Sequence, residues 1–212
     1  MPERGLLIAM EGLDGAGTTT QTERLVGRLE RVGARAHATR EPSDGPVGKL
    51  IREALARRWP GRDAQERVAA DSLALLFAAD RIDHLAHELE PRLSAGVHVI
   101  SDRYVLSSLA YQGMECDGQW VRVLNAHARP ADLTIFLQVE PEVALGRVIK
   151  RGGTRDIYEQ LEFQKQVHEG YEKALRKLPA GTGLRIDGAP APDAVEATIW
   201  HAVSRRLGLP TE

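Results

Sequence analysis

The sequence has little cysteine and no long apolar segment. Cys116 is the one cysteine among 212 residues, which excludes an intramolecular disulfide and a cysteine-ligated zinc site and suits a reducing compartment. The apolar run at residues 6–10 is too short for a signal sequence or a membrane span. Lys plus Arg, at 28, nearly balances Asp plus Glu, at 30, so we expect no nucleic-acid partner and no membrane partner. The expected location is the cytoplasm.

The length of the chain fits one domain spanning residues 1–212. Short β-rich runs alternate with long helical stretches, a pattern typical of a parallel sheet covered by helices. The runs expected to be strands are residues 6–10, 36–39, 97–101, 133–139 and 184–186. Residues 65–92 and 107–128 are each expected to form one helix longer than a crossover requires. Such helices can extend beyond the sheet and contact a second subunit.

A glycine-rich segment, Glu-Gly-Leu-Asp-Gly-Ala-Gly-Thr-Thr-Thr-Gln, follows the first expected strand at residues 11–21. Gly12 and Gly17 have the spacing of a phosphate-binding P-loop, and a helix is expected to begin near Thr18. Glycine-rich turns present backbone N–H groups to a phosphate, and the helix N-terminus adds the positive end of its dipole. The hydroxyl of Thr19 stands where the pattern binds Mg²⁺.

One element of the P-loop pattern is missing. The pattern has a lysine directly after its second glycine, and this chain has Thr18 there. That lysine brings a full positive charge to the β- and γ-phosphates, which a hydroxyl cannot replace. Backbone binding of phosphates is still expected. The missing charge must come from another residue, or else the loop belongs to a non-catalytic nucleotide-binding module.

A second polar segment, Ser-Asp-Arg-Tyr, ends the third expected strand at residues 101–104. Ligands of open α/β sheets gather at the carboxyl ends of strands. Because neighbouring residues at a strand end point to opposite sides, Asp102 can face the P-loop and its metal while Arg103 faces a second anion. A buried structural ion pair is the alternative.

With these elements the sequence resembles the thymidylate kinase family of P-loop nucleoside monophosphate kinases. The further matching segments are Thr-Arg-Glu-Pro at residues 39–42, Leu-Leu-Phe-Ala-Ala-Asp-Arg at 75–81 and Ser-Ser-Leu-Ala-Tyr-Gln at 107–112. The resemblance implies a P-loop NTPase-type three-layer α/β/α fold with a five-stranded parallel sheet. It also implies a homodimer that transfers the γ-phosphoryl group of ATP to dTMP with Mg²⁺. The residues expected to bind ATP are Gly12, Leu13, Asp14, Gly15, Ala16, Gly17, Thr18, Thr19 and Thr20.

The acceptor nucleotide is expected to lie between a ring and an arginine. Phe77 and Arg81 are four residues apart, hence on one helix face, and suit a planar heterocycle that carries a carbonyl. The resemblance assigns them to stacking on thymine and to its O4, whereas a core phenylalanine beside a surface arginine is the alternative. The residues expected to bind dTMP are Asp14, Arg40, Phe77, Arg81, Arg103, Ser108, Tyr111 and Gln112.

Two of these residues have particular expected roles. Arg40 follows the second strand and is expected to clamp the acceptor phosphate together with Arg103, unless it is a solvated charge at a strand end. Tyr111 is expected to stand against the 2′ carbon of the sugar and exclude ribose, unless it is a core tyrosine. A kinase for another nucleotide would keep the P-loop without combining Phe77, Arg81 and Tyr111 in this way.

A basic segment at residues 147–160 resembles the mobile lid of the family. Gly152 and Gly153 break a helix there, with Lys150, Arg151 and Arg155 around the break. One subtype of the family has an arginine after the P-loop aspartate, and another has glycine there with basic lid residues. Because Gly15 follows Asp14, this chain resembles the second. A plain charged helix end is the alternative. The expected catalytic residues are Asp14, Arg103, Arg151 and Arg155, with Arg155 preferred as the replacement for the lysine, and the expected metal ligands are Thr19 and Asp102.

Overall fold

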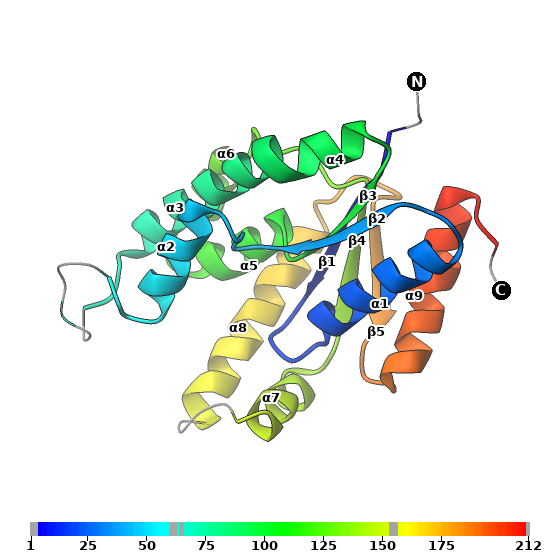
Figure 1. The fold of residues 1–212 in the computed structure, drawn as a ribbon. Helices are drawn as coiled ribbons and strands as arrows, with labels where there is room; N and C mark the ends of the chain where they lie inside the picture. The colour runs from blue at the N-terminus through cyan, green and yellow to red at the C-terminus, as the bar shows by residue number, and fades with distance from the viewer. Residues whose placement is uncertain (1–3, 60–62, 64–65, 153–156, 211–212) are drawn as a thin grey trace.

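A parallel sheet of five strands forms the centre of the molecule (Figure 1). The structure is a computed structural model that describes residues 4–59, 63, 66–152 and 157–210. The strands, in the spatial order β2-β3-β1-β4-β5, are β1 Leu7–Gly12, β2 Ala36–Arg40, β3 His98–Asp102, β4 Leu133–Gln138 and β5 Gly183–Asp187. Every neighbouring pair is parallel, which confirms the expected sheet, and the strand ends differ from expectation by one or two residues.

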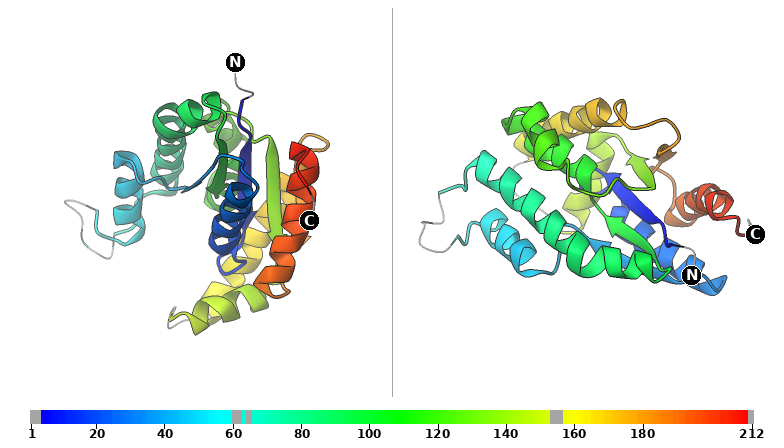
Figure 2. Two further views of the ribbon diagram at one scale, coloured as in Figure 1. Left: turned by 45° about the vertical axis from the view of Figure 1, so that its right-hand side comes forward. Right: turned by 90° about the horizontal axis from the view of Figure 1, so that it is seen from above.

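Helices cover both faces of the sheet and complete the expected three-layer α/β/α fold (Figure 2). Helices α1 (Thr18–Arg31) and α9 (Pro192–Leu207) lie together on one face. The opposite face carries α3 (Ala70–His84), α5 (Val105–Glu115) and α8 (Ile157–Leu175). The remaining regular helices are α2 (Pro46–Leu55), α4 (Glu90–Ser94), α6 (Gly118–Leu124) and α7 (Pro141–Lys150). None of the described helices combines the length and apolarity needed to cross a lipid bilayer.

Alternation along β1 ties the layers together. Ile8 and Met10 are fully buried in a cluster that includes Leu25 of α1. Leu7 and Ala9 belong to a separate cluster that includes Leu93 of α4. Because successive residues of a strand point to opposite faces, an unbroken apolar run places a strand at the centre of such a fold. Each fully buried leucine or isoleucine contributes roughly 1.5–3 kcal/mol.

The helix expected over residues 65–92 is wrong in its start and in its regularity. Helix α3 begins at Ala70, and a π-helical turn, η1 (Leu85–Leu89), separates it from α4. Pro91 lies in the first turn of α4. Its ring has no N–H and crowds the carbonyl four residues earlier, so a regular α-helix cannot pass through this position. The wider π turn lets the chain continue past the proline.

The helix expected over residues 107–128 is also wrong, because two helices occupy this stretch. The chain leaves α5 at Cys116, whose backbone is extended. Asp117 then caps α6, since its side chain accepts a hydrogen bond of 2.8 Å from the backbone N–H of Trp120. An aspartate whose side chain accepts from the backbone N–H three residues later is a strong signal for the start of a helix. Here it begins a second helix despite the helical composition around it.

The crossing of α5 and α8 gives a stability prediction with its own control. A Cβ on Gly170 of α8 would lie 2.7 Å from the carbonyl oxygen of Ala110, whereas a Cβ on Gly113 of α5 would meet nothing within 4 Å. We expect Gly170→Ala to lower the free energy of unfolding by roughly 1–3 kcal/mol through overpacking. Gly113→Ala should raise it by roughly 0.5–1 kcal/mol. Urea unfolding monitored by circular dichroism measures both, and changes of the same sign would contradict the packing described.

Candidate active site

The glycine-rich segment after β1 wraps around a cavity of about 550 Å³ that opens at the N-terminus of α1. Gly15 has a φ of +93° and Gly17 a φ of +100°, a left-handed backbone that favours glycine. Gly15 has a second requirement, because a Cβ there would lie 2.2 Å from the carbonyl oxygen of Ala144 in α7. The loop, the helix N-terminus and the cavity together form the arrangement that binds phosphates. The loop residues that line this cavity are Leu13, Asp14, Gly15, Gly17, Thr18, Thr19 and Thr20.

The side chain of Thr18 cannot reach a bound phosphate as the side chain of the missing lysine would. It is 6% exposed, and its Cγ2 lies 3.3 Å from where a Cβ of Gly12 would stand. Its methyl group therefore packs beneath the loop. Among the described residues that line the cavity, the cations are Arg103 and Arg151. A positive charge for bound phosphates must come from one of these or from the segment outside the described residues.

Thr19 and Asp102 meet at the same cavity. The Thr19 hydroxyl donates a 2.5 Å hydrogen bond to Oδ2 of Asp102, at the end of β3. Oδ1 of Asp102 is buried without a hydrogen-bond partner in the described part of the chain. Within these same ranges no group of three or more His, Cys, Asp or Glu side chains could hold a metal. Two hard oxygen ligands beside a phosphate site fit Mg²⁺, which keeps several waters and shares phosphate oxygens rather than entering an all-protein cage.

A second cavity, of about 370 Å³, adjoins the first and holds most of the expected acceptor residues. Asp14, Phe77, Arg81, Arg103, Ser108, Tyr111 and Gln112 all line it. Oε1 of Gln112 is buried and has no hydrogen-bond partner within the described ranges, so it can accept from a ligand. Sequence reasoning did not assign a site role to the other lining residues, Glu41, Pro42, Leu55, Leu73, Tyr104, Ser107, Met114, Glu115 and Phe163.

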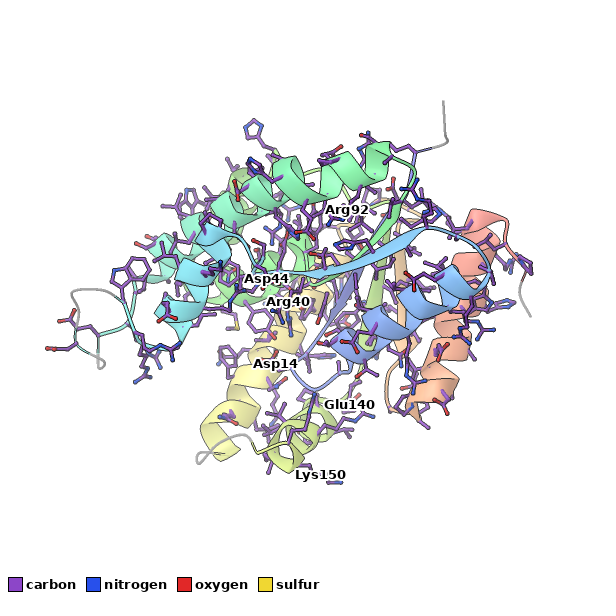
Figure 3. All side chains as sticks on the ribbon, viewed as in Figure 1. Asp14, Arg40, Asp44, Arg92, Glu140 and Lys150 are labelled. Carbon is purple, nitrogen blue, oxygen red and sulfur yellow. The ribbon has the colours of Figure 1, made fainter. Side chains whose placement is uncertain are left out.

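Arg40 lies apart from that cavity. Its side chain is 62% exposed at the end of β2 and pairs with Asp44 at 2.9 Å (Figure 3). Asp14 is labelled in the same view, on the loop after β1. The structure therefore brings Asp14 and Arg103 to the second cavity but leaves Arg40 outside its lining. To reach a ligand there, Arg40 would have to leave Asp44.

Arg81 is buried, with 1% of its surface exposed, rather than a surface arginine. Its Nε donates to Glu41 Oε2 at 2.8 Å, and its Nη2 donates to the carbonyl oxygen of Tyr104 and to Ser108 Oγ, both at 3.1 Å. Nη1 donates to Asn125. These contacts occupy most of the five N–H donors, so a ligand can share only a remaining N–H of Nη1. Removing Arg81 would also leave the buried Glu41 carboxylate without its charge partner, which is strongly destabilising.

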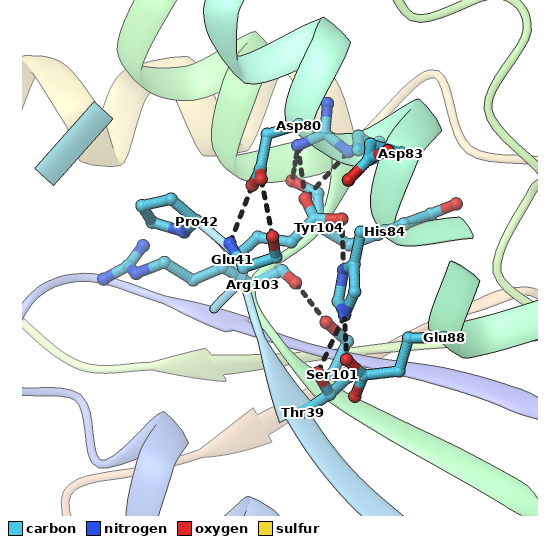
Figure 4. Close-up of polar contacts among 12 residues, drawn as sticks. Thr39, Glu41, Pro42, Asp80, Asp83, His84, Glu88, Ser101, Arg103 and Tyr104 are labelled. Atoms are coloured by element: carbon cyan, nitrogen blue, oxygen red, sulfur yellow. Dashed lines mark hydrogen bonds and ion pairs between the residues drawn. The ribbon is translucent and has the colours of Figure 1, made fainter. Parts of the chain in front are cut away.

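A polar network fastens the segment after β2 to α3 beneath the second cavity (Figure 4). His84 lies 3.4 Å from Glu41, and its Nε2 lies 2.8 Å from the hydroxyl of Thr39. Asp80 accepts hydrogen bonds from the backbone N–H and the hydroxyl of Ser43, at 2.7 and 2.6 Å. The network fixes Glu41 and, through it, the orientation of the Arg81 guanidinium.

Arg103 stands between the two cavities and lines both. Its backbone is left-handed, with a φ of +73°. Nη2 donates a 2.6 Å hydrogen bond to Asp14 Oδ1, and Nη1 donates to the carbonyl oxygen of Gly12 at 3.2 Å. Its guanidinium also lies 5.2 Å from the ring centre of Tyr111. Gln164 of α8 supports the same corner, since its Nε2 donates to the carbonyl oxygen of Asp14 at 3.1 Å.

A third hollow of about 250 Å³ continues from the phosphate loop toward the segment after β5. Arg147 of α7 anchors that segment by donating to the carbonyl oxygens of Gly188 and Ala189, at 2.9 and 2.8 Å. Arg151 lines this hollow as well as the phosphate cavity. Of the expected lid, Arg155 lies outside the described residues, as do the side chains of Tyr158 and Glu159.

Comparison with known proteins gives one consistent result. A family model described as thymidylate kinase matches residues 10–199. A "Probable thymidylate kinase" of Pyrobaculum aerophilum is 40% identical over 199 residues, which cover 93% of this chain and 96% of the relative. A thymidylate kinase of Hahella chejuensis is 34% identical over 212 residues, covering 97% of this chain and 99% of the relative.

Proposed function

The chain belongs to the thymidylate kinase family, and from this premise we propose that it transfers the γ-phosphoryl group of ATP to dTMP across the two adjoining cavities. The observation that carries the proposal is that Asp14 and Arg103 line both cavities at once. A donor phosphate on one side and an acceptor phosphate on the other would meet at this pair. The relatives give no support to a kinase for another nucleotide or to a non-catalytic module.

The phosphate cavity takes the ATP side of the reaction. Backbone groups of the loop from Gly12 to Thr20 and the N-terminus of α1 bind the triphosphate. Mg²⁺ would be held by Thr19 and Asp102, and when bound it supplies charge neutralisation of the phosphates. The hollow beside Arg147 and Gly188 leads away from the loop and provides room for the remainder of the nucleotide.

The second cavity takes dTMP. Thymine stacks on Phe77, the remaining Nη1 N–H of Arg81 reaches its O4, and Ser108 and Gln112 contribute polar groups. Tyr111 lies under the sugar, where its bulk excludes a 2′-hydroxyl. Arg103 binds the acceptor phosphate, and Arg40 joins it if the pair with Asp44 opens. This assignment is supported by the cavity itself, which is lined by all of these side chains except Arg40.

The chemistry needs positioning more than proton transfer. The acceptor phosphate is already an anion, so no strong general base is required. Asp14 holds Arg103 through the 2.6 Å contact and orients the acceptor oxygen for in-line attack. Arg103, joined by Arg40 when its pair with Asp44 opens, offsets the repulsion between the donor and acceptor phosphate groups. A cytoplasmic location is consistent with the single cysteine.

The acceptor assignment is tested by Phe77→Ala in a coupled ADP-release assay. Loss of a stacking ring costs roughly 1–3 kcal/mol per base, so KM for dTMP should rise by about 5- to 150-fold. KM for ATP should stay within about twofold, which serves as the internal control. Equal increases for both substrates would indicate general destabilisation and contradict the assignment. Arg81→Ala is a poorer test because it leaves Glu41 unpaired in the interior.

The missing lysine gives a second prediction. Arg151 belongs to the expected lid and, among the described lining residues of the phosphate cavity, is the lid cation. An arginine that supplies charge to a transferred phosphoryl group is worth roughly 10³–10⁵ in kcat. Arg151→Ala should therefore lower kcat by about 10³-fold or more with dTMP binding nearly intact, and Thr18→Lys in that background should recover part of the rate.

The same measurement with Arg155→Ala compares the two expected lid arginines. If Arg155→Ala alone lowers kcat, the role belongs to Arg155, the residue the sequence favours. If neither variant changes kcat in an active enzyme, the replacement of the lysine by lid arginines is wrong. Binding of both substrates without turnover would instead support the non-catalytic module.

The proposed assembly is a homodimer formed through α3. Leu75, Ala79 and Ile82 of α3 are all exposed and recur every three or four residues, which places them on one helix face, and the exposed Ala86 follows in η1. Val123 of α6, 61% exposed, is a further exposed apolar residue on the neighbouring helix. An apolar stripe of this kind on an otherwise charged surface is typical of a helix–helix interface between subunits.

We expect Ile82→Glu to convert the dimer to a monomer, because it places a charge in the centre of the stripe. Sedimentation velocity measures the change directly. Val143→Glu provides the matched control, since Val143 is similarly exposed, 44% against 41%, but lies on α7 outside the stripe. Identical sedimentation of wild type and Ile82→Glu would remove α3 as the interface.

A further inference from the structure

Glu11, next to last in β1, is a fully buried carboxylate with a complete set of donors. Its Oε1 accepts from the backbone N–H groups of Tyr104 at 3.0 Å and Ser107 at 3.2 Å. Its Oε2 accepts from the Ser107 hydroxyl at 2.6 Å and the Tyr171 hydroxyl at 3.1 Å. The side chain has no exposed surface. None of the roles assigned above uses it.

The two hydroxyls that bind Glu11 also contact Arg103. Nη1 of Arg103 lies 3.2 Å from Ser107 Oγ and 3.0 Å from the Tyr171 hydroxyl. A guanidinium only donates hydrogen bonds and an ionised carboxylate only accepts them. The Ser107 hydroxyl therefore gives its proton to Glu11, while the Tyr171 hydroxyl can give its proton to Glu11 or to Ser107 Oγ, which lies 2.8 Å away. The charge on Glu11 sets the direction of the hydrogen bond from Ser107.

The charge on Glu11 depends on the groups around it, whereas Arg103 is always protonated. Burial raises the pKa of Glu11, and the hydrogen bond from Ser107 and the positive charge of Arg103 act against that rise. A buried carboxylate keeps its charge only where donors and an opposite charge compensate for lost hydration. Arg103 in turn is held at the boundary of the two cavities in a left-handed backbone conformation.

We propose that Glu11 is a positioning residue that holds the Arg103 guanidinium at the junction of the two cavities through the hydroxyls of Ser107 and Tyr171. The role of that position in binding the acceptor phosphate rests on the proposed function. Glu11 acts on a second element as well, because Tyr104 and Ser107 open α5, whose own N-terminal residue supplies no side-chain cap. It thus fixes the start of the helix that carries Ser108, Tyr111 and Gln112.

The test compares Glu11→Gln with Tyr171→Phe. The amide keeps the shape of the side chain, but its NH₂ group donates to the hydroxyls, which then turn their protons toward Arg103 and repel it. We expect KM for dTMP to rise roughly ten- to a hundredfold, the scale of a lost charged hydrogen bond, while KM for ATP stays within about twofold. Tyr171→Phe, which removes one of the two hydroxyls, should give a smaller change in the same direction. In the double variant the two effects should not add.

A readout without turnover separates this inference from the proposed function. Phenylglyoxal labelling followed by peptide mass spectrometry reports the reactivity of each arginine. Arg103 should react several-fold faster in Glu11→Gln than in wild type, while Arg81, which pairs with Glu41, should react at the same rate in both. Equal acceleration of both arginines would show general loosening, and unchanged Arg103 labelling would overturn the proposal. A wild type inactive on dTMP would contradict the function, yet the labelling would still decide the role of Glu11.

Discussion

The ion pair between Asp14 and Arg103 joins the phosphate loop to the end of β3, and the placement of both cavities depends on it. Arg103 holds a left-handed backbone conformation that costs a non-glycine residue roughly 1–3 kcal/mol. The surrounding contacts offset this cost: its N–H donates to the carbonyl oxygen of Met10 at 2.8 Å, and its own carbonyl accepts from Ser101 Oγ at 2.7 Å. The backbone turn aims the side chain back across the loop instead of along the strand.

The cations of the site differ in how firmly they are held. Arg81 is locked by Glu41, Asn125 and two further acceptors, and Arg103 by a network of neutral and charged oxygens. Arg151 is exposed, and its hydrogen bond within the described residues runs from Nε to the carbonyl oxygen of Arg147 at 3.3 Å. Because Arg81 and Arg103 are held in fixed positions, they suit the recognition of a ligand of fixed shape. Arg151 can therefore change position at little cost, as its proposed lid role requires.

Much of the fold and part of the site follow from local sequence patterns. The buried strands and the P-loop have short-range signals, because burial on both faces demands apolar runs and the loop demands glycines. The two helix breaks were missed for different reasons: Pro91 lies inside a composition that favours helix, and the cap at Asp117 is a single side chain. Glu11 carried no signal, since only the fold shows that the carboxylate beside the loop meets Ser107 and Tyr171. Phe163 and the residues after β5 likewise reach the cavities only through tertiary packing.

The close approach of Gly15 to α7 limits how this loop can evolve. Its φ of +93° and the carbonyl oxygen of Ala144, 2.2 Å from any Cβ, leave no room for a side chain at that position. A loop of this shape cannot carry its own arginine after Asp14 without moving α7 away. A side chain after Asp14 therefore requires the loop and the helix to change together.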